Sequence, residues 1–228
     1  LTLNKKIIVC SKTKYKKIFD LTVGGYGLTG VILSATLKLK KIYSENIDQK
    51  IIEFKNFKQF YSIAKINHKY EYSVCWIDKF NENKIQGLYY FGNHSKKKQY
   101  IKATTFEEKK IGLLTLLLFR IIKSNFYFPK MMNFIFRNYK KNFYKKTCHY
   151  SDFFYPQDHV IDWYKIYGKK GFIQTQFIIP EKKFKKILGK LSNFLYEKKI
   201  YSGFVIIKKF KEKGKYLNFS GAGYSISF

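Results

Sequence analysis

The sequence predicts an α+β fold in which an antiparallel sheet carries helices on one face. Apolar and polar residues alternate, as they do in half-buried strands, at 6–10, 71–78, 87–93, 172–179, 202–210 and 216–228. Apolar residues recur with a helical period at 53–67 and 181–196, and a short helix is expected at 157–167. This order of helices and strands is typical of an antiparallel sheet that is covered by helices.

A glycine-rich stretch at residues 21–33 stands out in the N-terminal part of the chain. Gly25, Gly27 and Gly30 have the spacing of a dinucleotide fingerprint, which needs a helix directly after it. Residues 33–40 instead alternate between apolar and polar side chains, which predicts a strand and disfavours a Rossmann unit. The stretch is therefore a glycine bend. It either forms a tight turn without a ligand or brings backbone amides close to a flavin or a phosphate.

The charge of the chain is strongly basic, with 45 lysine and arginine residues against 15 acidic ones and a formal net charge of +30. Such a charge raises nucleic acid or an anionic membrane as a partner. The basic residues are nearly all lysines spread along the chain, and the only arginines are Arg120 and Arg137. Specific nucleic-acid recognition favours clustered arginines, so we do not expect nucleic-acid binding. A low-GC genome accounts for a lysine excess of this kind.

Cysteine and histidine usage gives no sign of a disulfide framework or a metal site. Cys10, Cys75 and Cys148 are odd in number and form no CxxC pair, which fits a reducing compartment. The four histidines are scattered without a metal-binding spacing, so no metal site is expected.

Residues 103–147 differ in composition from the rest of the chain. Residues 111–122 are apolar, but this run is only about half as long as a membrane-spanning helix. From 123 to 146, aromatic residues are mixed with basic ones, which is the composition of a segment lying in a membrane interface. An equally compatible alternative is a pair of helices that packs on its own domain with lysines facing water.

Four segments carry motifs in a characteristic order: 22–32 (TVGGYGLTGVI), 72–78 (YSVCWID), 155–180, which includes GFIQTQFIIP, and 204–210 (FVIIKKF). Their order and spacing resemble those of FAD-binding oxidoreductases of the vanillyl-alcohol oxidase superfamily, which have a PCMH-type FAD-binding domain. Within it they are most similar to the sugar-oxidising branch. The flavin subunit of that branch works with a separate reductase to epimerise a polyprenylphosphoryl ribose.

The resemblance implies two domains. Residues 1–43 would be the end of a PCMH-type FAD-binding domain, and 44–228 an incomplete substrate (cap) domain with a basic aromatic insertion at 103–147. It further implies a fragment lacking both ends, whose catalytic residues lie outside it and which is inactive alone. By resemblance, the bend holds FAD through backbone contacts at Thr22, Gly24, Gly25, Gly27, Thr29, Gly30 and Val31.

Candidate substrate-binding residues lie on strands that are otherwise apolar. Gln174 and Gln176 are two residues apart and so share a face. The residues alone leave a solvent-facing stripe open, whereas the resemblance implies that this face meets the substrate. By resemblance, Lys208 holds a phosphate or a sugar oxygen, and Trp76, otherwise a core residue, lies near the pocket wall. Ser227 stands where known members carry a cysteine beside the flavin, which puts thiol-dependent properties in doubt.

The activity that the resemblance implies is oxidation of a sugar hydroxyl, in a polyprenylphosphoryl pentose used as a cell-wall precursor, by hydride transfer to FAD. The implied partners are a lipid-linked or small sugar and an NAD(P)H-dependent short-chain reductase, with peripheral membrane contact. The implied location is cytoplasmic or peripheral to the inner face of the cell membrane, or periplasmic if a signal precedes residue 1. Two rivals remain: an aldonolactone oxidase of the same superfamily, and a non-catalytic basic protein at a membrane surface.

Overall fold

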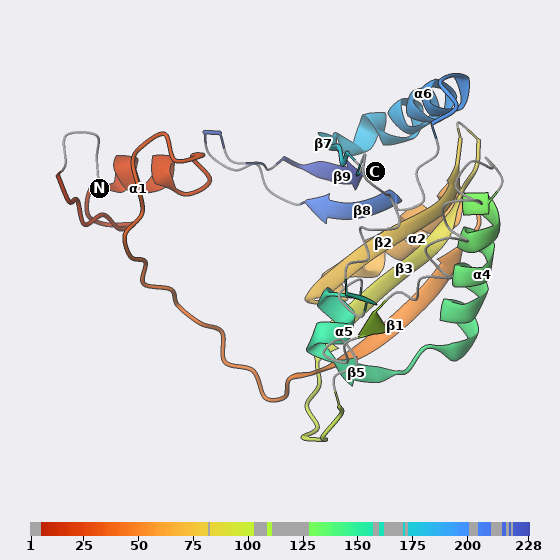
Figure 1. Ribbon diagram of the computed structural model, residues 1–228, viewed down its shortest axis with the longest axis horizontal. Coiled ribbons are helices and arrows are strands. Elements are labelled where there is room, and N and C mark those ends of the chain that lie inside the picture. The colour runs from red at the N-terminus through yellow and green to blue at the C-terminus, as the bar shows by residue number, and fades with distance from the viewer. Residues whose placement is uncertain are drawn as a thin grey trace.

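The computed structural model describes residues 6–81, 83–102, 109–110, 128–156, 160–161, 171, 173–200, 205–210, 216–217, 219 and 221–228. Its centre is a seven-stranded sheet with the strand order β5-β1-β3-β2-β8-β9-β7, in which all pairs are antiparallel (Figure 1). The strands are β1 (Asn46–Phe54), β2 (Tyr72–Phe80), β3 (Ile85–His94), β5 (Thr147–His149), β7 (Gln176–Ile179), β8 (Val205–Phe210) and β9 (Gly223–Ser227). The predicted α+β class with an antiparallel sheet is confirmed.

One face of the sheet is covered by α2 (Phe57–Lys65), which continues into η1 (Ile66–Lys69), and by α6 (Phe184–Glu197), which follows η3 (Glu181–Lys183). Phe60 of α2 stacks on Phe184 of α6 with ring centroids 5.6 Å apart, and it contacts Tyr224 of β9 at 5.4 Å. These rings join the two helices to the sheet in one apolar core. The helices expected within 53–67 and 181–196 are therefore confirmed.

The hairpin of β2 and β3 has a turn built on asparagine. The Asn81 side-chain oxygen accepts hydrogen bonds from the backbone N–H of Asn83 at 3.0 Å and of Lys84 at 2.7 Å. On β3, a Cβ atom at Gly87 would lie 2.0 Å from the carbonyl oxygen of Trp76, so the two strands can approach closely only with glycine there.

The opposite face of the sheet carries α4 (Phe128–Phe143) and α5 (Tyr150–Phe154). Trp76 of β2 points to this face, because its neighbours in the strand point to the core, and its ring lies 5.1 Å from that of Phe136 of α4. The expectation that helices lie on one face only is therefore wrong. Within the described part of the chain, no helix combines the length and the apolar character needed to cross a bilayer.

The N-terminal region lies apart from the sheet. It contains α1 (Lys16–Thr22), the glycine bend, and an extended segment at 31–45 that leads into β1 (Figure 1). The predicted strands at 6–10 and 33–40 are corrected here, because neither pairs with a described strand, and all side chains from 31 to 43 are exposed. An alternating sequence becomes a strand only when a second strand satisfies its backbone groups.

Several element bounds differ from the sequence expectations. The helix expected from residue 53 begins at Phe57, because Asn56 caps it by accepting a hydrogen bond from Gln59 N at 2.9 Å. Strands β7 and β9 are shorter than predicted, with residues 216–217 in a turn. The helix expected at 157–167 is contradicted at β6 (Val160–Ile161), whose backbone pairs in parallel with β4 (Lys109–Lys110). The rest of that predicted helix lies outside the described residues.

The three cysteines are free thiols in different environments. Cys75 is fully buried in the core, and burial raises its pKa well above the usual value. Burial also raises the pKa of Cys148 to about 12, whereas Cys10 is partly exposed. The two buried thiols are therefore poor nucleophiles at neutral pH.

Candidate functional site

Five polar side chains lie together where β7, β9 and β8 run side by side. We call this set the polar sheet face; its members are Gln174, Gln176, Lys208, Ser225 and Ser227. Directly paired residues of antiparallel strands point to the same side, and the register pairs Gln176 with Ser227 and Lys208 with Ser225. The intervening residues of β9, Tyr224 and Ile226, point into the core. The polar sheet face therefore lies on the side opposite α2 and α6.

The two glutamines are anchored on the two serines of β9. Gln174 Nε2 donates to Ser227 Oγ at 2.5 Å, and Gln176 Nε2 donates to Ser225 Oγ at 2.8 Å. Thr175 and Phe228 exchange backbone hydrogen bonds, which extends the strand pairing to Gln174. The sequence prediction that both glutamines share one face is confirmed. Their carboxamide oxygens stay available as acceptors, and each serine hydroxyl can still donate.

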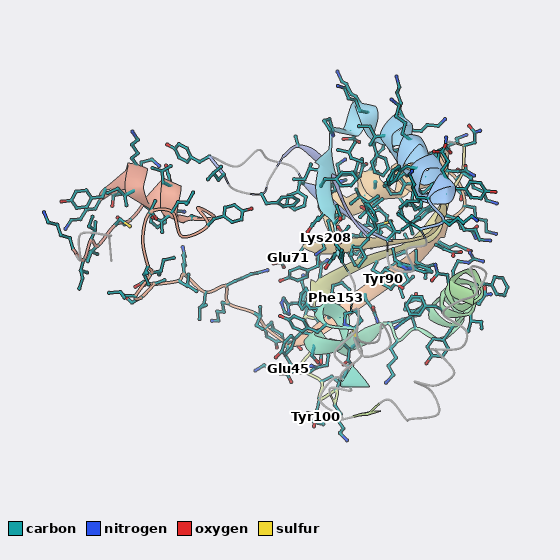
Figure 2. The ribbon with its side chains drawn as sticks, turned by 45° about the horizontal axis from the view of Figure 1, so that its top comes forward. Glu45, Glu71, Tyr90, Tyr100, Phe153 and Lys208 are labelled. Atoms are coloured by element: carbon teal, nitrogen blue, oxygen red, sulfur yellow. The ribbon has the colours of Figure 1, made fainter. Side chains whose placement is uncertain are left out.

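Lys208 supplies a positive charge to this face. Its side chain is exposed, and within the described part of the chain it forms no ion pair. The next residue, Lys209, points to the other side and lies 3.4 Å from Glu181 Oε1. Figure 2 labels Lys208 on β8 and Tyr90 on β3. Two adjacent lysines thus have opposite orientations, and only Lys208 can meet a ligand on the polar sheet face.

Trp76 borders the polar sheet face on β2. The register places it opposite Ile206 of β8, which is in turn opposite Ser227 of β9. The indole is buried, and Nε1 has no acceptor among the described residues. A buried N–H group without a partner costs about 1–3 kcal/mol, so the Trp76 indole is a strained element of this border.

The glycine bend consists of successive tight turns after α1. Leu28 N donates to Gly25 O at 3.0 Å, and Gly30 N donates to Gly27 O at 3.1 Å. Gly27 has a φ of 74°, and a Cβ atom there would meet nothing within 4 Å. The bend is thus compact yet open at Gly27, which leaves room for a ligand to approach the backbone.

Hydroxyl groups close the two ends of the bend on each other. Thr22 Oγ1 lies 2.8 Å from Thr29 Oγ1 and donates to Ile18 O at 2.7 Å. The backbone N–H groups of Tyr26, Gly27 and Thr29 have no acceptor among the described residues. These free amides can receive a phosphate oxygen or a flavin carbonyl, so the bend fits such a group.

The structure groups the predicted substrate residues but leaves the predicted cofactor residues elsewhere. Trp76, Gln174, Gln176, Lys208 and Ser227 lie on one side of the same four strands. The glycine bend lies apart from this side, at the far end of the extended segment (Figure 1). The chain therefore holds two candidate sites, one made of side chains and one made of backbone.

One member of the polar sheet face was missed from the sequence. Ser225 is buried and accepts the hydrogen bond of Gln176, whereas the sequence predicts a role only for Ser227. The alternation of Tyr224-Ser-Ile-Ser-Phe228 predicts that Ser225 points the same way as Ser227, because the two residues are two positions apart on a strand.

A second cluster of polar side chains has the composition of a catalytic triad but not its geometry. His149 Nδ1 lies 2.7 Å from Ser151 Oγ, and His149 Nε2 lies 3.5 Å from Glu45 Oε2. Ser151 is buried, and its own N–H is directed at His149 Nδ1, which makes the histidine the N-cap of α5. The cluster begins a helix and offers no accessible nucleophile.

Comparison with known proteins supports a distant relationship. No family model matches the chain. A curated relative, the decaprenylphosphoryl-β-D-ribose oxidase of Mycolicibacterium smegmatis, is 28% identical over 178 residues. The match covers 72% of this chain and 37% of the relative, so the chain spans little more than a third of the relative's length. The similarity supports a relationship at the level of a family.

Proposed function

We propose that the chain is part of an FAD-dependent oxidoreductase that oxidises a hydroxyl group of a polyprenylphosphoryl pentose. In this proposal the polar sheet face binds the substrate and the glycine bend contacts the cofactor. The observation that carries it is the grouping of Gln174, Gln176, Lys208 and Trp76 on one side of the sheet. The distant similarity to an oxidase of decaprenylphosphoryl ribose supports the same reaction class.

The side chains of the polar sheet face match the chemistry of a phosphorylated sugar. The glutamine oxygens accept hydrogen bonds from sugar hydroxyls, while the buried serine hydroxyls hold the two glutamine amides in place. The Lys208 ammonium attracts the phosphate. Because Ser225 and Ser227 hold both glutamines by their amide ends, the acceptor oxygens are oriented before the sugar arrives.

The glycine bend supplies backbone donors for FAD. Tyr26, Gly27 and Thr29 would donate their free N–H groups, and the contact between Thr22 and Thr29 would keep the bend closed. FAD, when bound, accepts the hydride that leaves the oxidised sugar carbon. A separate NAD(P)H-dependent reductase would then return the resulting ketone to an alcohol.

The main alternative is an aldonolactone oxidase of the same superfamily. Its substrate carries no phosphate, so an unpaired lysine on the substrate side would have no anionic partner. Lys208 therefore favours the phosphorylated sugar. A non-catalytic basic protein would have no need of the ordered glutamine–serine pairs.

Anaerobic mixing of a polyprenylphosphoryl ribose with the flavin-loaded whole protein, purified from its own source, tests the proposal. We expect the absorbance of oxidised flavin to bleach in a single turnover, and an aldonolactone to leave it largely unchanged. Bleaching by the lactone alone would select the alternative. A flavin that neither compound reduces would contradict both oxidase functions.

A further inference from the structure

Helix α4 is amphipathic, but it presents its polar side to the sheet. Asn133 and Arg137, one helical turn apart, are buried against the protein. Phe134 is 52% exposed, Ile135 51% and Tyr139 58%. A helix that packs on its own domain normally buries its apolar side chains, whereas here, among the described ones, only Phe136 contacts the sheet and the other three face away from it.

Two carboxylates fix this orientation. Arg137 pairs with Asp78 of β2, whose side chain is fully buried, and Arg137 Nε lies 3.6 Å from Glu53 Oε1 of β1. Turning the helix over would separate the fully buried Asp78 carboxylate from the Arg137 guanidinium, which is costly in the interior. The outward position of Phe134, Ile135 and Tyr139 is therefore imposed by the fold.

All charged residues in the sequence around these exposed side chains are basic. Residues 109–151 contain ten lysine and arginine residues and no acidic residue. Lys145 and Lys146, which directly follow α4, are exposed. A second copy of this chain would bring the same positive charge to the interface, so self-association through α4 is opposed by repulsion. The charge instead complements an anionic surface.

We propose that the outward side of α4, made of Phe134, Ile135 and Tyr139, docks on an anionic lipid bilayer. The aromatic and aliphatic side chains enter the boundary between headgroups and acyl chains, and the flanking lysines contact acidic headgroups. Phe136 of the same helix touches Trp76 at the edge of the polar sheet face. The docked helix would thus bring a membrane close to that face, a consequence that rests on the proposed function.

Flotation of the 228-residue chain with lipid vesicles tests the docking without any need for flavin or substrate. We expect binding to vesicles of phosphatidylglycerol and phosphatidylcholine in equal parts, and much weaker binding to phosphatidylcholine alone. The triple variant Phe134→Ser, Ile135→Ser, Tyr139→Ser should bind the anionic vesicles about tenfold less tightly or worse. Circular dichroism should show that the variant is folded, because these side chains are exposed.

The matched control is the double variant Phe194→Ser, Tyr196→Ser on α6, where the side chains are 51% and 73% exposed. It should bind anionic vesicles as the parent chain does. Unchanged binding by the α4 variant would overturn the proposal, because charge alone would then explain adsorption. Failure of the parent chain to bind, or a dimer in sedimentation that the α4 variant dissociates, would also overturn it. The proposed oxidation can fail while this result stands.

Discussion

Replacing Arg137 by alanine should lower the free energy of unfolding by about 3–5 kcal/mol, the cost of removing one partner of a buried ion pair. Asp78 has a fully buried side chain, and Arg137 is its cationic partner across the interface of α4 and β2. Without the guanidinium, the Asp78 carboxylate stays in the interior and loses its directly paired cation. Chemical denaturation followed by circular dichroism measures the change.

The size of this loss should depend on pH. Burial, the largest influence, raises the pKa of Asp78, and the Arg137 charge opposes that rise. Removing Arg137 raises the folded-state pKa further, so the folded protein holds the proton more tightly than the unfolded chain. Stability is then greatest below the ordinary aspartate pKa of about 4 and falls as pH rises toward the folded-state pKa. The variant should therefore lose less stability at pH 4 than at pH 7.

The double variant Arg137→Met, Asp78→Asn provides the control. It keeps similar volumes and removes the charges of the buried Asp78–Arg137 pair, while Glu53 is partly exposed, so it should recover most of the stability that Arg137→Ala loses. It should also lose the extra pH dependence. A double variant as unstable as Arg137→Ala would show that side-chain packing, and not the unpaired carboxylate, causes the loss.

Replacing Lys208 by methionine should weaken substrate binding by about 10- to 100-fold, because one charge-assisted hydrogen bond contributes about 1.5–3 kcal/mol. The lysine is exposed on the polar sheet face opposite Ser225, where it can meet the phosphate of a lipid-linked sugar. Stopped-flow measurement of flavin reduction against substrate concentration gives the change. The flavin content should stay that of the parent protein.

Lys209→Met is the matched control, since Lys209 is the next residue, points to the other side and pairs with Glu181. It should bind substrate as the parent protein does. Gln176→Ala should slow flavin reduction and keep the flavin, because it removes the acceptor held by Ser225. Equal losses in both lysine variants would indicate a general effect of positive charge, and no loss in either would remove Lys208 from the site.

Elements with a strong local pattern were predictable from the sequence. The alternation in β2 and β3 and the asparagine turn between them define the hairpin. Helix α6 carries an apolar stripe that the core receives, with Phe184 and Leu188 fully buried. Here propensity, period and turn chemistry agree, so local reasoning is sufficient.

Elements that depend on distant partners were not predictable. Strand β1 mixes buried and exposed residues irregularly, and it is specified by its pairing with β3 and β5. Helix α1 is seven residues long and has no side-chain N-cap. The inverted orientation of α4 depends on Asp78, 59 positions before Arg137, and no local pattern contains that ion pair.

The candidate site also combines features that were predictable from the local sequence with features that were not. The period of two placed Gln174 and Gln176 on one side, and the register then added Lys208 and both serines. The identity of the anchors on β9 required the fold, because they lie about 50 residues from the glutamines: 53 positions for one pair and 49 for the other. The glycine bend was recognisable from its glycine spacing, and the structure places it apart from the polar sheet face. FAD binding at the bend therefore stays a proposal that needs its own test.

The flavin-to-protein ratio of the protein purified from its own source tests most directly whether the glycine bend binds FAD. Gly27 and Gly171 form a matched pair, since both have positive φ and open space where a Cβ atom would lie. We predict a yellow protein with about one flavin per chain, loss of flavin in Gly27→Val, and retention in Gly171→Val. A colourless parent protein, or equal flavin content in both variants, would contradict the account.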